Sequence, residues 1–119
     1  MKKERTIEQF LEAITTSEIS VDCKTQRALG LFNGKWRTYV LYELCRHTTL
    51  RFGEIKKAIP LITNTMLTST LRDLEHLGIV SREQFNEIPP RVEYSLTQSG
   101  KALLPVFFEI VKWSEKYLS

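Results

Sequence analysis

One stretch of the sequence combines polar side chains that suit a binding surface: TNTMLTSTLR, residues 63–72. It contains five hydroxyl groups, one amide, one guanidinium and no acidic residue. Short hydroxyl and amide side chains let a helix approach base edges closely and bond to bases or phosphates. The stretch therefore predicts a nucleic-acid contact. Its expected contact residues are Asn64, Thr65, Thr68, Ser69 and Arg72.

The residue types of this stretch are unfavourable for a helix that merely faces solvent. Ser, Thr and Asn are poorer helix formers than the Glu and Lys that such a helix normally carries. The alternative is an exposed polar face without a ligand. A helix N-terminus adds attraction for phosphate. If Arg72 reads a base edge, Arg72→Ala weakens specific binding by about 1–3 kcal/mol.

The positive charge of the chain is concentrated in its middle. Residues 35–82 hold eight Lys/Arg against four Asp/Glu, a net of +4, whereas residues 1–34 are neutral and 83–119 have a net of −1. This asymmetry favours an anionic partner for the middle segment. The candidate phosphate contacts are Lys35, Arg37, Arg51, Lys56, Lys57, Arg82 and Arg91. Each taken alone is also explained as a solvated surface charge, and Lys35 and Arg51 are favoured because each lies next to the start of a predicted helix and beside an aromatic residue.

The stretch FNEIPPRVEYSLT, residues 85–97, predicts a hairpin with a stiff tip. Prolines remove backbone donors, so a sheet tolerates them at edges and turns. Arg91 directly follows Pro90, and an arginine on such a tip is suited to a phosphate backbone or a minor groove.

Periodicity places these side chains on a mostly helical α+β framework. Thr6 begins a first helix through a capping box, and further helices are expected at 25–32, 36–46, 52–59 and 64–77. Thr63 is the expected N-cap of the 64–77 helix, whose buried face holds Leu67, Leu71 and Leu74, with Thr70 as a further candidate. Strands follow at 79–85 and 92–96, and residues 47–50 form a break or a short strand. This order is that of a winged helix-turn-helix.

The last predicted helix, 98–118, has more apolar surface than one face can hold, so it lies either in the middle of the domain or at an interface. The small size of the chain favours the interface. Pro105 should kink it or mark a restart. The short apolar stripe of the first helix likewise needs a partner. The residues expected in a dimer interface are Phe10, Leu11, Leu104, Phe107, Phe108, Val111 and Trp113.

Enzymatic and metal chemistry find little support. His47 and His76 have no Cys, His or carboxylate cluster at metal spacing, and no catalytic triad or glycine-rich phosphate loop is readable. We expect no enzyme, metal or cofactor.

Cys45 fits a small core residue. Cys23, placed before the second helix near cations, is a candidate redox sensor, with an inert thiol as the alternative.

A length of 119 residues and 42% hydrophobic content favour one globular domain. We expect an N-terminal arm at 1–22, a winged core at 23–97 and a dimerisation helix at 98–119. No apolar run reaches the roughly 20 residues of a membrane helix. Two cysteines and the lack of an apolar leader segment favour the cytoplasm.

Several short sequence motifs occur in the order seen in HxlR-type transcriptional regulators, and the chain resembles that family over about residues 23–113. They include Asn33-Gly34-Lys35-Trp36, Arg51-Phe52-Gly53-Glu54-Ile55, Leu71-Arg72-Asp73-Leu74-Glu75 and Pro89-Pro90-Arg91-Val92-Glu93-Tyr94. The resemblance implies a bacterial or archaeal homodimer, built by the N- and C-terminal helices, that binds a palindromic double-stranded DNA operator. Some members of the family sense oxidants or electrophiles through a cysteine at the place of Cys23.

The expected function is therefore sequence-specific DNA binding, with helix 64–77 in the major groove and hairpin 79–96 on the backbone or minor groove. One rival is a winged-helix module for protein–protein interaction that does not bind DNA. A third reading, compatible with DNA binding, places a small-molecule effector among Phe107, Phe108 and Trp113.

Overall fold

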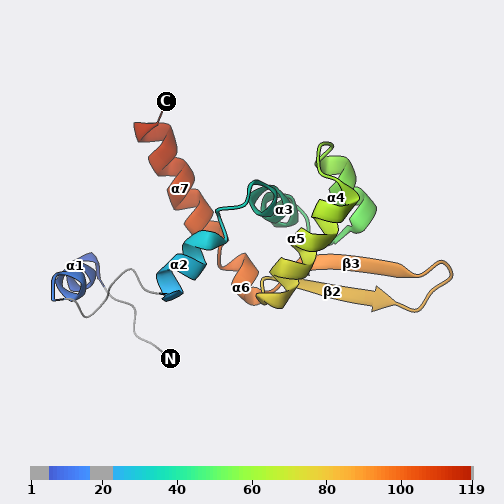
Figure 1. Cartoon of the computed structure of the whole chain (residues 1–119), viewed down its shortest axis with the longest axis horizontal. Coiled ribbons are helices and arrows are strands. Elements are labelled where there is room, and N and C mark those ends of the chain that lie inside the picture. The colour runs from blue at the N-terminus through green and yellow to red at the C-terminus, as the bar shows by residue number, and fades with distance from the viewer. Residues whose placement is uncertain (1–5, 17–22, 119) are drawn as a thin grey trace. The chain divides into compact units, whose positions relative to one another are not determined.

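The structure, a computed structural model, describes residues 6–16 and 23–118 (Figure 1). The chain divides into two units, residues 1–33 and 34–119. The first contains α1 (Ile7–Thr15) and α2 (Cys23–Gly30). The predicted capping box of α1 is confirmed: the Thr6 hydroxyl accepts from the Gln9 backbone N–H at 3.2 Å, and the Gln9 amide oxygen accepts from that of Thr6 at 2.9 Å.

The start of α2 corrects the sequence-based boundary. The helix begins at Cys23, two residues earlier than predicted, so this cysteine belongs to the first turn and does not precede the helix. The side chain of Cys23 lies outside the part of the chain that the structure describes.

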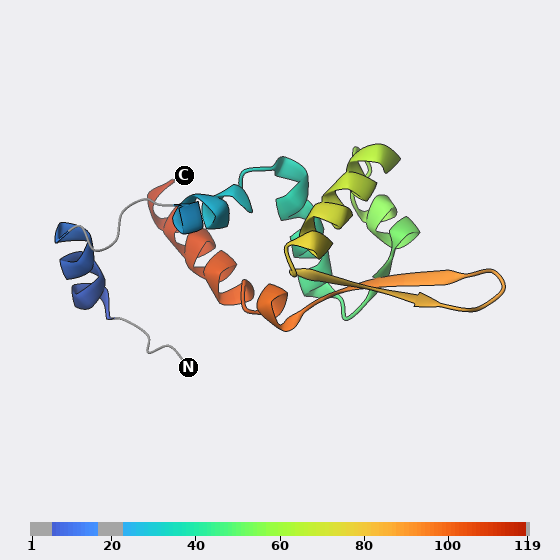
Figure 2. The ribbon, with the colours of Figure 1, turned by 60° about the horizontal axis from the view of Figure 1, so that its bottom comes forward.

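The second unit has the predicted order of a winged helix-turn-helix. It contains α3 (Lys35–Arg46), β1 (Leu50–Arg51), α4 (Phe52–Ala58), α5 (Asn64–His76), β2 (Val80–Phe85), β3 (Arg91–Leu96), α6 (Gln98–Lys101) and α7 (Leu104–Tyr117). The strands form an antiparallel sheet in the order β1-β3-β2, and Arg82 stands opposite Tyr94. In Figures 1 and 2 the hairpin β2–β3 extends past the helices.

The core of this unit fixes the rotation of α5. Leu67, Leu71 and Leu74 are at most 2% exposed and pack in a core with residues of α3 and α4, and Thr70 is 5% exposed. This confirms the predicted buried face. Since helical residues three and four apart share a face, the side that holds residues 64, 65, 68, 69 and 72 points outward.

Hydrogen bonds join the end of α5 to the start of α6. Gly78 has a φ of +77°, which favours glycine. Its carbonyl accepts from the hydroxyls of Thr97 at 2.6 Å and Ser99 at 2.9 Å. Gly100 is buried, and a Cβ there would collide with the backbone oxygen of Ile79. The closeness of these backbones holds α5, the hairpin and α6 together as one piece.

The C-terminal segment is two helices, so Pro105 marks a restart and not a kink. Pro105 lies in the first turn of α7, where its missing N–H removes no helical hydrogen bond. Phe107, two residues on, is 4% exposed, and its ring stacks on Tyr42 of α3 with centroids 5.1 Å apart. This contact attaches α7 to the winged core.

Candidate nucleic-acid interface

The outward side of α5 forms a shallow groove. All five residues singled out in the sequence, Asn64, Thr65, Thr68, Ser69 and Arg72, line one hollow of about 440 Å³. Four are exposed, and Thr68 is half-buried. The groove offers hydroxyl, amide and guanidinium groups in one row, the set that base edges and phosphates bind.

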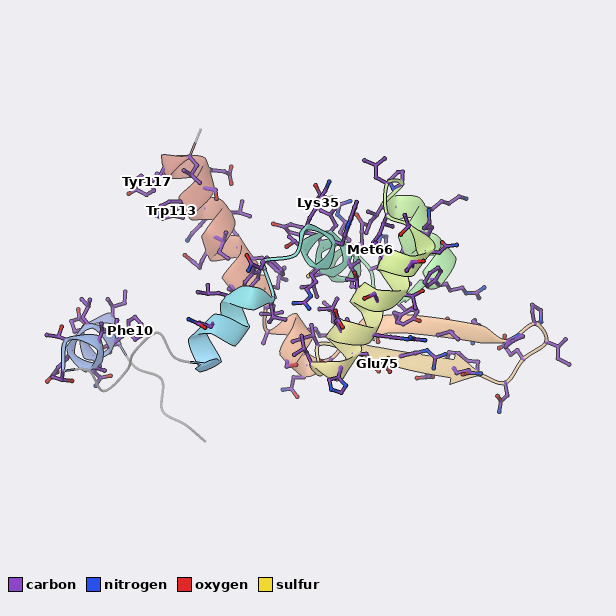
Figure 3. The ribbon with its side chains drawn as sticks, in the orientation of Figure 1. Phe10, Lys35, Met66, Glu75, Trp113 and Tyr117 are labelled. Carbon is purple, nitrogen blue, oxygen red and sulfur yellow. The ribbon has the colours of Figure 1, made fainter. Side chains whose placement is uncertain are left out.

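The first turn of α5 is held by its cap. The Thr63 hydroxyl accepts from the Met66 backbone N–H at 3.1 Å, which confirms Thr63 as the N-cap. Its hydroxyl is therefore engaged within the helix start. Met66, which the sequence reasoning did not assign to the interface, is 42% exposed on this turn and adds an apolar group (Figure 3).

Asp73 was also missed, and it lines the same groove. Its carboxylate is paired with Arg37 of α3, Oδ2 to Nη2 at 3.2 Å. An unpaired carboxylate in this position would repel phosphates, and the ion pair offsets that charge. Helical spacing could have indicated that Asp73 lines the groove, because it is four residues after Ser69 and shares its face.

The structure places Arg91 differently from the expected free arginine at the hairpin tip. It begins β3, its Nη2 lies 3.3 Å from Glu87 Oε1, and its Nε lies 3.5 Å from Glu93 Oε2. The guanidinium also lies over the Phe85 ring, 4.1 Å from its centroid. Two carboxylates thus already neutralise this cation, and its role as a DNA contact stays a prediction.

Lys35 and Arg51 lie apart from the α5 groove. Lys35 is the exposed first residue of α3, with its Nζ 4.8 Å from the Trp36 ring centroid (Figure 3). It lines another hollow, between α3 and the end of α4. Arg51 is exposed on β1, and its backbone N–H donates to the Glu54 carboxylate at 2.8 Å. Both are accessible to a large polyanion.

The predicted interface residues fall into two groups. Phe10, Leu11, Leu104, Phe108 and Trp113 are 48–59% exposed, and Val111 is half-buried. Phe107 differs: it is already buried against Tyr42, so it belongs to the protomer's own core and not to an exposed face. Ile110, Tyr117 and Leu118 add exposed apolar surface on or next to α7 that the sequence reasoning did not assign.

Cys45 on α3 is half-buried and so is not one of the fully buried core residues, and burial raises the pKa of its thiol. Within residues 6–16 and 23–118 no group of three or more His, Cys, Asp or Glu is placed to hold a metal ion. In the same residues no helix has the length and apolar character needed to span a bilayer.

Comparison with known proteins identifies the family. The HxlR-like helix-turn-helix family matches residues 31–119. An uncharacterized HTH-type transcriptional regulator from Methanothermobacter thermautotrophicus is 44% identical over 95 residues, which cover 80% of this chain and 72% of the relative. The uncharacterized HTH-type transcriptional regulator YdeP from Bacillus subtilis is 43% identical over 95 residues, which cover 80% of this chain and 73% of YdeP.

Solved structures agree. The reduced form of the transcriptional regulator YodB from B. subtilis superposes with a TM-score of 0.77 at 33% identity, covering 84% of this chain and 97% of that one. The redox regulator HypR in its oxidized form superposes with a TM-score of 0.70 at 38% identity, covering 82% of this chain and 99% of HypR. The winged-helix fold and the family resemblance are thereby confirmed, and the chain belongs to the HxlR-like helix-turn-helix family of transcriptional regulators.

Proposed function

We propose that this protein is a homodimeric regulator that binds a palindromic double-stranded DNA operator and has no enzymatic activity. One observation carries the proposal: the hydroxyl- and amide-bearing side of α5 is turned outward and lines a continuous groove. A helix presented in this way enters the major groove, where each base pair has a distinct pattern of donors and acceptors.

Contacts to bases and to phosphates are made by different residues. Asn64, Thr65, Thr68 and Ser69 have short side chains that reach base edges, with Asn64 suited to adenine. Lys35 and Arg51, which flank the helix-turn-helix on exposed positions, contact the sugar–phosphate backbone. Family membership and the excess of cations in residues 35–82 support this division of roles.

The dimer is built through the exposed apolar residues of the terminal helices. Leu104, Phe108 and Trp113 are each more than half exposed in the single chain, although buried positions are usual for such side chains. Two-fold pairing places two copies of α5 in successive major grooves about one helical turn apart, which predicts a palindromic site.

The test is binding to DNA upstream of the protein's own gene and neighbouring genes, measured by fluorescence anisotropy across a salt series. We expect one fragment to bind at least ~1000-fold more tightly than an unrelated duplex. The double variant Thr68→Ala with Ser69→Ala should remove most of this preference. The control variant Glu115→Gln, which changes an exposed side chain of α7, should keep it. Equal, weak binding of every duplex would favour the rival protein-interaction module.

We further propose that Cys23 makes the regulator responsive to oxidants or electrophiles. It occupies the first turn of α2, where a helix N-terminus stabilises thiolate. Support also comes from the neighbours, since HypR is named a redox regulator and YodB was studied after diamide treatment. Diamide should alter operator affinity of the unchanged protein and of Cys45→Ser but not of Cys23→Ser. The same response in Cys23→Ser would exclude this cysteine as the sensor.

A further inference from the structure

A second hollow lies beside the α5 groove, between α5 and the base of the hairpin. It has a volume of about 380 Å³, and two arginines line it, Arg72 from α5 and Arg82 from β2. Thr68 and Tyr94, which each carry a hydroxyl, also line it, and Glu75 is the one acidic residue among its lining residues. Glu75 is labelled near the end of α5 in Figure 3. Arg72 and Thr68 also line the α5 groove, so the two hollows adjoin.

Arg82 and Arg91 are on the same hairpin but differ in what they contact. Arg91 is ion-paired with two glutamates and lies over Phe85. Arg82 is exposed, and its guanidinium only reaches the Gln84 amide oxygen at 3.5 Å, a long distance for a hydrogen bond. Among the described residues, no carboxylate forms an ion pair with Arg72 or Arg82.

The register of the sheet turns Arg82 toward α5. It follows the buried Val80 by two residues and so lies on the same face of β2, and it stands opposite Tyr94, which lines the same hollow. The tip beyond it offers no unpaired cation, because residues 80–96 contain only two arginines, of which Arg91 is paired, against three glutamates. The available charge of the hairpin is therefore at its base.

We propose that this hollow is a binding site for one phosphate of the DNA backbone, and that Arg82, not Arg91, is the arginine through which the hairpin holds it. The inference rests on the proposed DNA-binding function. Two guanidinium groups from different elements bind a phosphate with several charge-assisted hydrogen bonds. A phosphate held there would fix the position of α5 in the adjoining major groove without reading sequence.

Glu75 gives a second test of the site, in which a substitution should strengthen DNA binding instead of weakening it. Its carboxylate lines the same hollow and opposes the phosphate, so Glu75→Gln should increase affinity for every duplex. The matched variants Arg82→Gln and Arg91→Gln each remove one positive charge from one hairpin, which makes their comparison independent of net charge. Arg82→Lys keeps the charge and controls for damage to the strand.

The experiment measures affinity for the operator and for an unrelated duplex from 50 to 200 mM salt, with circular dichroism to confirm folding. One lost phosphate contact lowers the slope of log affinity against log salt by about 0.9, so the ratio of affinities at 50 and 200 mM should fall about 3.5-fold. We expect this for Arg82→Gln on both duplexes, and not for Arg91→Gln or Arg82→Lys.

Two results would overturn the inference while leaving the proposed function intact. One is an unchanged slope in Arg82→Gln with a reduced slope in Arg91→Gln. The other is a loss of affinity in Arg82→Gln confined to the operator, because removing a phosphate contact must weaken binding to all sequences alike. Failure of the unaltered protein to bind any duplex would instead refute the proposed function, and this inference with it.

Discussion

Helices α5 and α7 are of nearly equal length, 13 and 14 residues, yet they expose opposite kinds of surface. α5 buries Leu67, Leu71 and Leu74 and exposes hydroxyls, an amide and a guanidinium. α7 buries Phe107 and leaves Leu104, Phe108 and Trp113 more than half exposed.

The difference shows which kind of partner each face suits. A face of short polar groups loses little by staying in water and gains only when matching donors and acceptors approach. A face of large apolar groups gains from any burial, at about 25 cal/mol per Å² removed from water. α5 is therefore suited to a selective polar ligand, and α7 to a permanent protein contact.

The largest expected effect comes from placing charge on the α7 face. Phe108→Glu combined with Trp113→Glu puts carboxylates where the second copy should pack. The dimer dissociation constant should rise at least ~100-fold, because aromatic anchors at interfaces commonly contribute 2 kcal/mol or more each. Analytical ultracentrifugation measures it. Glu115→Gln, on the same helix, should leave the dimer intact, and a dimer that survives the double change would remove α7 from the interface.

A second change acts on the junction that positions both helices. Gly100→Ala introduces a Cβ that collides with the Ile79 carbonyl, so the free energy of unfolding should fall by about 1–3 kcal/mol. Gly53→Ala is the matched control in α4, because no atom beyond its chain neighbours and the helix's own backbone lies within 4 Å of the new Cβ. There, stability should rise by up to about 1 kcal/mol. Urea denaturation distinguishes them, and equal changes would contradict the close approach.

A smaller and more diagnostic effect is expected on the α5 face. Ser69→Ala removes one exposed hydroxyl and should weaken operator binding by about 0.5–1.5 kcal/mol. Because Ala is the better helix former, the same change should leave stability unchanged or raise it by a few tenths of a kcal/mol. A loss of operator affinity without a loss of stability would identify Ser69 as a residue that serves binding. A parallel loss of both would assign Ser69 to the fold.

The smallest effect concerns the Cys45 thiol near the start of α7. Burial raises its pKa, so at pH 8 its thiolate fraction is below that of an ordinary cysteine, and it should react more slowly with iodoacetamide than free cysteine does. The rate should increase as pH rises through the raised pKa. Mass spectrometry on Cys23→Ser isolates this thiol. Because Leu104 shares a hollow with Cys45, Leu104→Ala should accelerate the reaction.

Local patterns were sufficient to predict most of the fold. The capping residues Thr6 and Thr63 and the periodic leucines of α5 specify their elements through neighbours a few residues away, and these predictions are confirmed. The outward side of α5 followed, because fixing the buried face of a helix fixes the opposite one.

Features that depend on distant residues were not predicted. The pairing of Asp73 with Arg37 joins residues 36 positions apart. The neutralisation of Arg91 depends on strand register and side-chain packing, and the burial of Phe107 depends on Tyr42 of another helix. A helix pattern states which residues are apolar but not whether the protein's own core or a partner covers them.

The hydroxyls of Thr97 and Ser99 on the Gly78 carbonyl have a mechanical consequence. They fasten the end of α5 to the start of α6, and Phe107 fastens α7 to α3 within three turns of that point. If α7 forms the proposed dimer contact, any rotation of α7 relative to the second copy must therefore carry α5 with it. In the proposed dimer, an effector that only altered the angle between the two α7 helices would change the distance between the two copies of α5. The two copies could then no longer fit both half-sites of an operator at once, although the effector would bind far from the DNA.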